Sequence, residues 1–371
     1  MKQKKILFAA VDIGWRINRY KKLLKRKHKS AISITSFVKY KVPASQFKAS
    51  YDYEFNYQEL NQILQWSKSL SFFSKAIFRY DVFHFFSGET ILTRKLRKLE
   101  FIIYRIFNKF VSMHFVGSDI RNPEYLYWKA EKLFHPEWDV SAPKIQQQWQ
   151  LKLKEDSLRF ANKIVVSTPD LLEIIPSAKY LPILMDHQEF ESSFSEHTSE
   201  KDKFFNTQKI RILHAPSNTK TKGSKYIDLI VKELVNNQNH RFEYIYTPDL
   251  KANSNSLYSV NRYDLFQLYR EADIVIDQMV IGWYGQQSLE ALLSKNAVVC
   301  YIDPLYSDHL KDNFPIFNAS FDKLSKRVEE VASLIEEKAI DFNSQIEWVK
   351  ENHSEKALYE TLETALNLRS S

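Results

Sequence analysis

Short apolar runs alternate with longer amphipathic segments along most of the chain, and this alternation restricts the fold more than any other feature. Runs of about four to eight apolar residues between turn residues are typical of buried strands, and longer segments with a helical period are typical of helices. Strands that alternate with helices form parallel sheets covered by helices on both faces, so the sequence predicts an α/β protein. The expected strands are 4–11, 31–37, 81–86, 110–116, 163–167, 179–184, 209–214, 241–246, 273–277 and 296–301. The expected helices are 16–28, 57–78, 91–108, 123–132, 144–160, 223–236, 262–271, 285–294, 320–338 and 343–368.

A change of composition between Glu191 and Thr207 divides the pattern into two halves. Ser, Glu, Lys and Asp dominate this stretch, and no periodic apolar pattern crosses it, which is typical of a linker. The chain has 371 residues, 44% of them apolar, enough for two domains with a core each. We predict a first domain over 1–190, a linker over 191–207, a second domain over 208–342 and a C-terminal helix over 343–371.

The single cysteine, Cys300, lies inside an apolar run. One cysteine excludes an intramolecular disulfide and a thiolate metal cluster, and a buried strand position in a reducing compartment explains it. The N-terminal apolar run from Ile6 ends before Asp12, so it is shorter than a signal-peptide core or a membrane span. We therefore expect a soluble or peripheral protein in the cytoplasm.

A strongly basic segment follows the first expected strand. The formal net charge is +8, and eight lysine and arginine residues fall within 16–29. Ile17, Tyr20 and Leu24 recur there at helical spacing, which predicts an amphipathic helix with a basic outer face. Three interpretations remain open: a solvated face, a surface that rests on anionic lipid at the inner face of the membrane, and a nucleic-acid patch. The last is the least favoured, because no known nucleic-acid-binding pattern accompanies the segment.

Glycine is rare in the chain and is concentrated at one kind of position. A chain of this length carries roughly 25 glycines at the usual frequency, and this one has six. Each of them follows the end of an expected strand or opens the next helix. Glycine lets the backbone turn sharply or approach a ligand, and ligands of open parallel sheets bind at this edge, so we predict a ligand cleft there. The six are Gly14, Gly88, Gly117, Gly223, Gly282 and Gly285.

The loops that contain these glycines carry polar and aromatic residues that a turn does not need. None of the loops follows the pattern G-x-G-x-x-G, and none follows the phosphate-binding pattern G-x-x-x-x-G-K-[ST]. No G-x-S-x-G elbow marks a serine nucleophile. The sequence therefore disfavours a dinucleotide oxidoreductase, a P-loop kinase and a serine hydrolase.

Two segments of the second half resemble segments of GT-B glycosyltransferases of the family 4 type. The strand that ends in the stretch 214–218, followed by Lys222, Gly223 and a helix, is similar to their phosphate-binding segment. The stretches 272–278 and 282–292 are similar to their nucleotide-sugar segment. In the first half, weaker similarities cover 117–121 and 161–172. The resemblance implies two Rossmann-like domains that face a central cleft, with the C-terminal helix crossing back to the first domain.

The resemblance further implies that Lys222 and Gly223 bind the diphosphate of a nucleotide sugar. They lie where a strand leads into a helix, so a cation and a helix N-terminus coincide. Such groups neutralise the charge that develops on a leaving diphosphate without a metal. Lys220 and Asn218 lie close by in the sequence and are further candidates. A solvated loop position is the alternative for both lysines.

Other residues are implied to surround the donor. Glu290 lies on the first turns of the helix that Gly285 opens, where the resemblance implies that it accepts hydrogen bonds from the ribose hydroxyls. Stabilisation of that helix end is the alternative role for its carboxylate. Tyr284 either shapes the donor pocket or packs beneath the loop. Gly14 would let the backbone approach the acceptor or the phosphates.

Two residues of the first domain, His114 and Asp119, are candidates for the catalytic side. His114 either hydrogen-bonds the donor sugar or the acceptor near the reacting carbon, or is a strand-end histidine satisfied by its neighbours. Asp119 either orients the acceptor hydroxyl or caps the turn that follows it. Asp12 is a third candidate on the acceptor side.

Two positions depart from the pattern of the family. Many members carry two glutamates eight positions apart; Glu290 matches the second, and Gly282 occupies the place of the first. Many also carry an arginine five residues before the lysine that Lys222 matches, and Ser217 stands there. The sequence therefore does not predict which sugar is transferred.

The sequence as a whole predicts a glycosyltransferase of the hexosyltransferase type that serves bacterial surface polysaccharide biosynthesis. The expected partners are a nucleoside diphosphate sugar, a saccharide or lipid-linked acceptor, and an anionic membrane touched through 16–29. The resemblance implies retention of anomeric configuration, no metal, and no cofactor besides the co-substrate. The alternatives are a non-catalytic binding protein of the same fold, suggested by Gly282, and a nucleotide-sugar epimerase of that fold.

Overall fold

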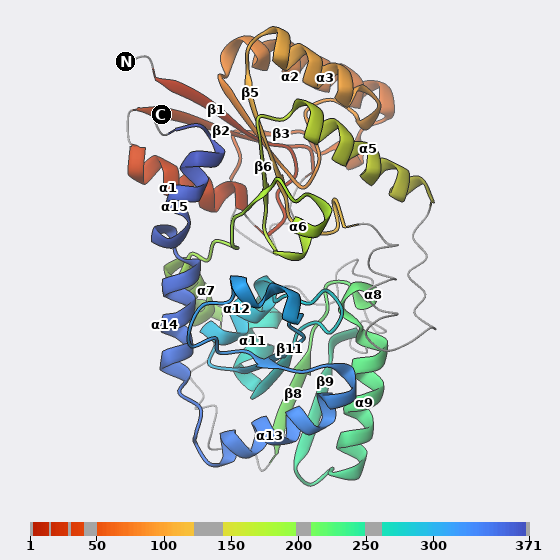
Figure 1. Cartoon of the computed structure of the whole chain (residues 1–371), viewed down its shortest axis with the longest axis vertical. Coiled ribbons are helices and arrows are strands. Elements are labelled where there is room, and N and C mark those ends of the chain that lie inside the picture. The colour runs from red at the N-terminus through yellow and green to blue at the C-terminus, as the bar shows by residue number, and fades with distance from the viewer. Residues whose placement is uncertain are drawn as a thin grey trace. The chain divides into compact units, whose positions relative to one another are not determined.

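The computed structural model describes residues 3–14, 16–28, 31–40, 50–121, 144–197, 209–248 and 262–368. These residues form two compact units, each built around one parallel sheet (Figure 1). Unit 1 reaches Leu184 and resumes at Glu355, and unit 2 runs from Met185 to Ser354. The α/β class expected from the alternation of strands and helices is confirmed.

The sheet of unit 1 has seven strands in the order β3-β2-β1-β4-β5-β6-β7, and every neighbouring pair is parallel. The chain runs from β1 to one edge, returns to β4 beside β1, and continues to the other edge. Sheets wound in this way bind ligands outside the carboxyl ends of their strands at the point of reversal, here between β1 and β4. The strands are β1 (Lys4–Ala9), β2 (Ile32–Val38), β3 (Tyr53–Glu54), β4 (Val82–Phe86), β5 (Phe110–Phe115), β6 (Lys163–Val166) and β7 (Lys179–Tyr180).

Helices from both ends of the chain cover one face of this sheet. Tyr20 and Leu24 of α1 and Leu358 and Leu362 of α15 share a buried cluster with Phe8 of β1, and Figure 1 shows α1 and α15 side by side. The other face packs against apolar side chains of α2, α3, α5 and α6. The helices are α1 (Arg16–His28), α2 (Gln62–Arg79), α3 (Arg97–Ile106), α5 (Lys144–Phe160), α6 (Asp170–Ile174) and α15 (Glu355–Ala365), with 3₁₀ turns η1 (Tyr57–Glu59) and η2 (Arg94–Leu96).

The sheet of unit 2 has five parallel strands in the order β12-β11-β10-β8-β9. The chain moves from β8 to β9 at one edge and then to β10, β11 and β12 on the other side. This is the second common doubly wound order, and its point of reversal lies between β8 and β10. The strands are β8 (Ile210–His214), β9 (Phe242–Tyr246), β10 (Ile274–Ile276), β11 (Ala297–Cys300) and β12 (Phe317–Asn318).

Helices α9 and α13 pack together against the unit 2 sheet through Ile227, Val231 and Val328. Helix α14 packs against α12 elsewhere in the unit, where the Gln345 side chain donates to the Leu292 carbonyl oxygen at 3.0 Å. The helices are α7 (His187–His197), α8 (Thr219–Lys222), α9 (Ser224–Asn237), α11 (Arg262–Glu271), α12 (Gln286–Leu293), α13 (Leu324–Glu336) and α14 (Phe342–His353), with 3₁₀ turns η3 (Pro304–His309) and η4 (Phe321–Lys323).

Helix α7 occupies the first part of the segment 191–207, for which an irregular linker was expected. Its Phe190 and Phe194 lie four residues apart and pack against Phe266 of α11. This packing of two aromatic residues at helical spacing holds one face of the short helix against α11, although the Ser- and Glu-rich composition around them is typical of a loop. Residues 198–207 of the expected linker lie outside the described residues.

The single helix expected over 343–368 is two helices, α14 and α15, which are separated at Ser354. Ser354 has an extended backbone, with φ −79° and ψ 169°, and this ends the helical run. Only α15 is part of unit 1. The two-residue strands β3 and β12 and the short helix α6 were not expected, and the helix expected over 123–132 lies outside the described residues.

The basic face of α1 is partly paired within unit 1. Arg26 forms an ion pair with Glu355, and His28 lies 3.1 Å from Glu363, both on α15. Arg16 and Arg19 point inward and are almost fully buried. The charge of this segment is therefore explained in part by an acidic neighbouring helix, while the contact with a membrane stays a prediction. In the described ranges, no helix combines the length and the apolar character needed to span a bilayer.

Replacement of Leu362 by alanine tests the contribution of α15 to the core of unit 1. The Leu362 side chain is fully buried, and loss of a buried leucine side chain lowers the free energy of unfolding by roughly 2–5 kcal/mol. Urea denaturation followed by circular dichroism measures the change. The control is Leu305→Ala, because Leu305 is 72% exposed and its loss should cost no more than about 0.5 kcal/mol. Equal stability of the two variants would contradict the packing of α15.

Candidate functional site

The carboxyl ends of β8 and β10 lie beside each other at the point of reversal of the unit 2 sheet. Beyond β8 the chain forms α8 and α9, and beyond β10 the loop 277–285 leads into α12. The two connections touch, because the Met279 amide donates to the Lys222 carbonyl oxygen at 3.1 Å. Ligands of doubly wound sheets bind at this place, so its side chains are the first candidates for a functional site.

Lys222 and Asp277 form an ion pair at this point. The Asp277 carboxylate has no exposed surface, and its Oδ2 accepts from the Ser288 hydroxyl at 2.5 Å and from the Gly285 amide at 3.3 Å. Burial alone would raise the pKa of Asp277, but the charge and hydrogen bond of Lys222, with those of Ser288 and Gly285, hold it below its usual value. The Lys222 ammonium also donates to the Gln287 side chain, which fixes it over the first turn of α12.

Two helices begin at this ion pair without a side chain that caps them. Helix α9 starts after Gly223 and α12 starts after Gly285, and at neither start does an N-cap side chain accept a hydrogen bond from a first-turn amide. The first amides of a helix lack partners inside it and carry partial positive charge, so they favour anions. Gly223 has φ +80°, and a Cβ atom there would lie 2.6 Å from Phe321, so only glycine fits.

His214, at the end of β8, connects this strand with β10 and α9 through two hydrogen bonds. Its Nδ1 lies 2.8 Å from the carbonyl oxygen of Ile276 on β10, and its Nε2 lies 2.8 Å from the Ser224 hydroxyl on α9. Burial lowers the pKa of His214 to about 4, so the ring is neutral at pH 7. A neutral ring donates to the carbonyl oxygen through Nδ1 and accepts from the hydroxyl at Nε2. Because both nitrogens are used, His214 positions the site and does not bind a ligand.

Glu290 is almost fully buried on the second turn of α12. Its Oε1 lies 2.7 Å from the Arg262 guanidinium and accepts from the side-chain Nε2 of Gln286 at 2.7 Å. Glu290 therefore belongs to the same helix end as Gln287, which holds the Lys222 ammonium. A hydroxyl group of a ligand that reaches Glu290 would share the carboxylate with Arg262.

The structure thus brings four of the predicted residues, Lys222, Gly223, Gly285 and Glu290, to the start of α12 and α9. Asn218 lies nearby as the exposed N-cap of α8, where its side chain accepts from the Thr221 amide at 3.0 Å. Lys220 is exposed on the same helix. These two residues form the outer rim of the loop and are not part of the buried network.

Tyr284 is not directed into this site. Its hydroxyl lies 3.1 Å from Nε2 of His353, and its ring stacks on Trp283 and meets the edge of Trp348. The side chain is only 4% exposed. Of the two roles weighed for Tyr284, packing beneath the loop describes its position among the described residues, and the role in shaping a donor pocket stays a prediction.

Gly282 is a glycine because of its local structure. Its φ is +81°, and a Cβ atom there would lie 2.6 Å from the Cβ of Asp303. The Asp303 amide also donates to the Gly282 carbonyl oxygen at 3.0 Å, which ties the two segments together. A glutamate at this position, as in many family 4 enzymes, would therefore need a different loop.

The sequence did not single out several residues that build this site. Asp277 and Gln278 follow the apolar strand β10, and a polar pair directly after a buried strand is a signal that points to a site. Gln278 shapes the loop, since its Oε1 accepts from the amides of Val280 and Ile281 at 3.0 and 2.7 Å. The pairing of Asp277 with Lys222, 55 positions away, has no signal in the sequence.

In unit 1, His114 lies inside the sheet and has no exposed surface. Its Nε2 lies 2.9 Å from the Ser167 hydroxyl, and its ring packs against Phe86 and Tyr20. Burial lowers the pKa of His114 well below its usual value, with further contributions from His84 and Arg16. A ring in this position does not touch a substrate in the described conformation, so its catalytic role stays a prediction.

The Asp119 carboxylate is turned toward its own loop. It accepts from the amides of Val116, Gly117 and Ile120 at 3.0, 2.8 and 3.1 Å. Burial raises the pKa of Asp119, although the hydrogen bonds of Val116 and Gly117 oppose the shift. These contacts describe a residue that shapes the loop, and its catalytic role also stays a prediction.

Gly14 and Asp12 lie just beyond the end of β1. Gly14 has φ +68°, a conformation that favours glycine. Asp12 accepts from the Ile17 amide at 3.3 Å and from the Tyr51 hydroxyl at 3.1 Å, and burial raises its pKa to about 6. In the described part of the chain, no group of three or more His, Cys, Asp or Glu residues is arranged to hold a metal ion.

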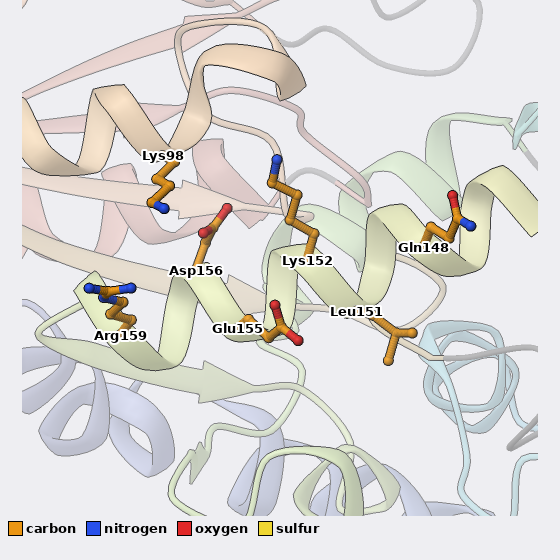
Figure 2. Close-up of a pocket in the computed structure, with 7 residues that line it drawn as sticks. All are labelled: Lys98, Gln148, Leu151, Lys152, Glu155, Asp156 and Arg159. Atoms are coloured by element: carbon orange, nitrogen blue, oxygen red, sulfur yellow. The ribbon is translucent and has the colours of Figure 1, made fainter.

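A pocket of about 410 Å³ lies on the helical layer of unit 1 between α3 and α5. Figure 2 shows Lys98 of α3 pointing toward Asp156 of α5, with Lys152 and Arg159 beside them. Positive and negative side chains alternate around it, and none of its residues comes from the loops at the strand ends. We therefore do not regard it as the functional site. Its lining is Lys98, Gln148, Leu151, Lys152, Glu155, Asp156 and Arg159.

Several solved structures have a similar fold, and two of them hold UDP or UDP-glucose. Sucrose-phosphate synthase from Thermosynechococcus elongatus gives a TM-score of 0.57 at 10% identity, with 99% of each chain covered. HepE (Alr3699) from Anabaena in complex with UDP-glucose gives a TM-score of 0.54 at 14% identity, with 98% of this chain and 100% of that chain covered. An α-glucosyltransferase in complex with UDP and DNA gives a TM-score of 0.54 at 10% identity, with 99% of this chain and 100% of that chain covered.

The chain therefore has the GT-B glycosyltransferase fold, and the fold that the motifs implied is confirmed. No protein-family model matches the sequence, and no curated protein matches it. At identities of 10–14%, these similarities concern the fold alone.

Alanine at Gly282 and at Gly285 should have different effects on stability. At Gly282 the positive φ and the contact with Asp303 should together lower the free energy of unfolding by roughly 2–4 kcal/mol. Gly285 has an extended backbone, and a Cβ atom there would lie 3.6 Å from its nearest neighbouring atom. The substitution Gly285→Ala should therefore change the free energy of unfolding by no more than about 1 kcal/mol. Denaturant titration of both variants checks this, and an equal loss would contradict the loop geometry.

Replacement of Lys222 by methionine should reverse the pH dependence that Asp277 contributes to stability. The pKa of Asp277 is lowered in the folded protein, so the ion pair stabilises the fold above the unfolded pKa of about 4 and loses this contribution as the pH falls. Without Lys222, burial raises that pKa, and the charged carboxylate destabilises the fold at neutral pH. The stability difference between Lys222→Met and the wild type should be largest near pH 7 and shrink below about pH 4. A difference that does not change with pH would contradict this.

Proposed function

We propose that the chain is a glycosyltransferase that binds a nucleoside diphosphate sugar in unit 2. The observation that carries the proposal is the meeting of the Lys222 ammonium with the uncapped starts of α9 and α12 at the reversal point of the sheet. A lysine and helix N-termini are groups that bind phosphate. The structures of similar fold in complex with UDP or UDP-glucose support the same type of ligand.

The number of donors on Lys222 is compatible with a ligand. An ammonium group has three N–H bonds, and within the described residues Asp277 and Gln287 take two of them. The third is available to a phosphate oxygen. Asp277 balances the charge of Lys222, so the attraction for a diphosphate comes from this one hydrogen bond together with the first amides of α9 and α12. During transfer, the same groups would stabilise the negative charge that develops on the leaving diphosphate.

Glu290 is assigned to the ribose of the donor. Its carboxylate lies on the second turn of α12, a short distance along the helix from Gln287, and it is a strong acceptor for hydroxyl groups. Arg262 forms an ion pair with this carboxylate and fixes its direction. The contact with Arg262 would persist when ribose binds, because a carboxylate accepts several hydrogen bonds at once.

The finer points of the function rest on the resemblance of the motif segments to family 4 enzymes. These are transfer with retention of configuration, independence of metals, and an acceptor that is a saccharide or a lipid-linked saccharide of a bacterial surface polysaccharide. A location in the cytoplasm, with the acceptor at the inner face of the membrane, belongs to the same proposal. His114 and Asp119 are assigned to the catalytic side as positioning residues, because their side chains are engaged in unit 1.

A non-catalytic binding protein of the same fold is the second candidate. The specific observation in its favour is Gly282, where the loop and Asp303 leave no room for the glutamate that many family members carry. Such a protein would bind the nucleotide sugar without turnover. Incubation with a radiolabelled donor and a membrane extract separates the candidates, because only a transferase moves the label into the extract.

A thermal-shift screen against nucleoside diphosphate sugars tests the proposed function. At a ligand concentration of 100 times Kd, binding adds about 2.7 kcal/mol of stability, so a matching donor should raise the Tm of the full chain by several degrees. The shift should be lost in Lys222→Gln and in Glu290→Gln. Lys220→Gln is the matched control, because Lys220 is exposed on α8, and it should keep the shift. Failure of UDP, GDP and ADP sugars alike to shift the wild type would refute the proposal.

A further inference from the structure

Two arginines are buried to the same extent at the carboxyl edge of the unit 1 sheet, Arg16 after β1 and Arg121 after β5, each 7% exposed. Arg121 is neutralised by a buried partner, since its Nε donates to Asp170 at 2.8 Å. Within the described residues, Arg16 has no such partner. Its Nη1 donates to the Ser167 hydroxyl at 2.9 Å, and its Nε is buried without a hydrogen bond. The two residues therefore share burial and position but differ in charge balance.

The nearest acidic residues do not neutralise Arg16. The Asp119 carboxylate accepts from three amides of its own loop, and Asp12 accepts from Ile17 and Tyr51. Within the described residues, neither acid lies within ion-pair distance of the Arg16 guanidinium. An unpaired buried charge is costly. Burial also lowers the pKa of Arg16, and Asp119 and Asp12 compensate for this only at longer range.

The location of Arg16 adds a second reason to expect an anion. Arg16 lies on the first turn of α1, a helix of 13 residues, where the helix dipole disfavours a cation and favours an anion. This turn follows Gly14 at the reversal point between β1 and β4, where ligands of such sheets bind. A buried guanidinium that is unbalanced at such a place is explained if a ligand supplies the missing negative charge.

We propose that unit 1 contains an oxyanion site, formed by the Arg16 guanidinium and the first turn of α1, that binds a phosphoryl or carboxylate group of a substrate. The planar guanidinium presents paired N–H groups that match the two oxygens of such a group. The ligand is the anionic group of the acceptor or the diphosphate of the donor. The site itself does not depend on the proposed function, and only the identity of the substrate rests on it.

Binding of inorganic phosphate to the full chain tests this site by isothermal titration calorimetry. The titration uses Lys222→Gln, in which the proposed diphosphate site of unit 2 is weakened, as the background. Addition of Arg16→Gln to that background should weaken phosphate binding by about tenfold or more, because a charge-assisted hydrogen bond is lost. Arg16→Lys should keep part of the affinity. Phosphate affinity within about twofold of the background in the Arg16→Gln protein would overturn the proposal.

Stability separates a binding role of Arg16 from a structural one. Arg16→Gln removes an unbalanced buried charge, so the Tm without ligand should stay the same or rise. Arg121→Gln is the matched control, because it leaves Asp170 buried and unpaired and should lower the Tm by roughly 6 °C or more. Comparable losses in the two variants would show that Arg16 serves the fold, and this would also overturn the proposal.

The source of the anion is resolved by repeating the phosphate titration with wild-type protein saturated with UDP. The part of the phosphate binding that is lost in Arg16→Gln identifies this site. Persistence of that part with UDP would assign the site to an anionic acceptor, and its loss with UDP would assign the site to the donor diphosphate, whereas competition that does not depend on Arg16 belongs to unit 2. Both results support the oxyanion site. The proposed function fails independently, since a chain that binds phosphate through Arg16 but no nucleotide sugar would refute only the glycosyltransferase proposal.

Discussion

The buried ion pair of Lys222 with Asp277 is the constraint on which the organisation of unit 2 depends. A carboxylate with no exposed surface is tolerated only if its charge is balanced and its oxygens accept hydrogen bonds. Lys222 supplies the charge from the end of α8, and Ser288 and Gly285 supply hydrogen bonds from the start of α12. The Asp277 side chain, directly after β10, therefore fixes the positions of α8, of the loop 277–285 and of α12, which begins after that loop.

The two units handle charge at their reversal points in opposite ways. In unit 2 the cation is balanced by Asp277, so the affinity of the site for an anion rests on backbone amides and on one remaining N–H of Lys222. In unit 1 Arg16 is unbalanced, while the acids near it are used by the backbone of their loops. A site whose charges are balanced is stable without a ligand, whereas a site with an unbalanced charge is stabilised when it binds an anion. Arg16 and Arg121 show this difference within unit 1, because Arg121 forms an ion pair with Asp170 whereas Arg16 forms no ion pair within the described residues.

Much of the fold was predictable because the apolar pattern reports burial directly. Long strands such as β1, β4 and β5 were found within a few residues, and the glycines marked the carboxyl edge of the sheets. Two-residue strands such as β3 and β12 carry too little pattern, and the aromatic pair of α7 was hidden by a polar composition. In the site, Lys222 and Glu290 were found from the motifs. The partner of Lys222 was not, because the pairing depends on the order of β8 and β10 in the sheet, which the pattern of one sequence does not specify.

The loop 278–285 shows how a departure from the family pattern can be structural. Gln278 holds the loop by accepting from the amides of Val280 and Ile281, and Asp303 fills the space where a side chain at Gly282 would lie. Since Gly282 has only backbone atoms, any contact with a donor sugar from this position uses an amide or a carbonyl group. Such groups are neutral and less selective than a carboxylate toward sugar hydroxyls. In the proposed transferase, the shape of this loop would take over part of the selection among donors, and Gln278, which holds the loop through Val280 and Ile281, is the residue through which that shape would be changed.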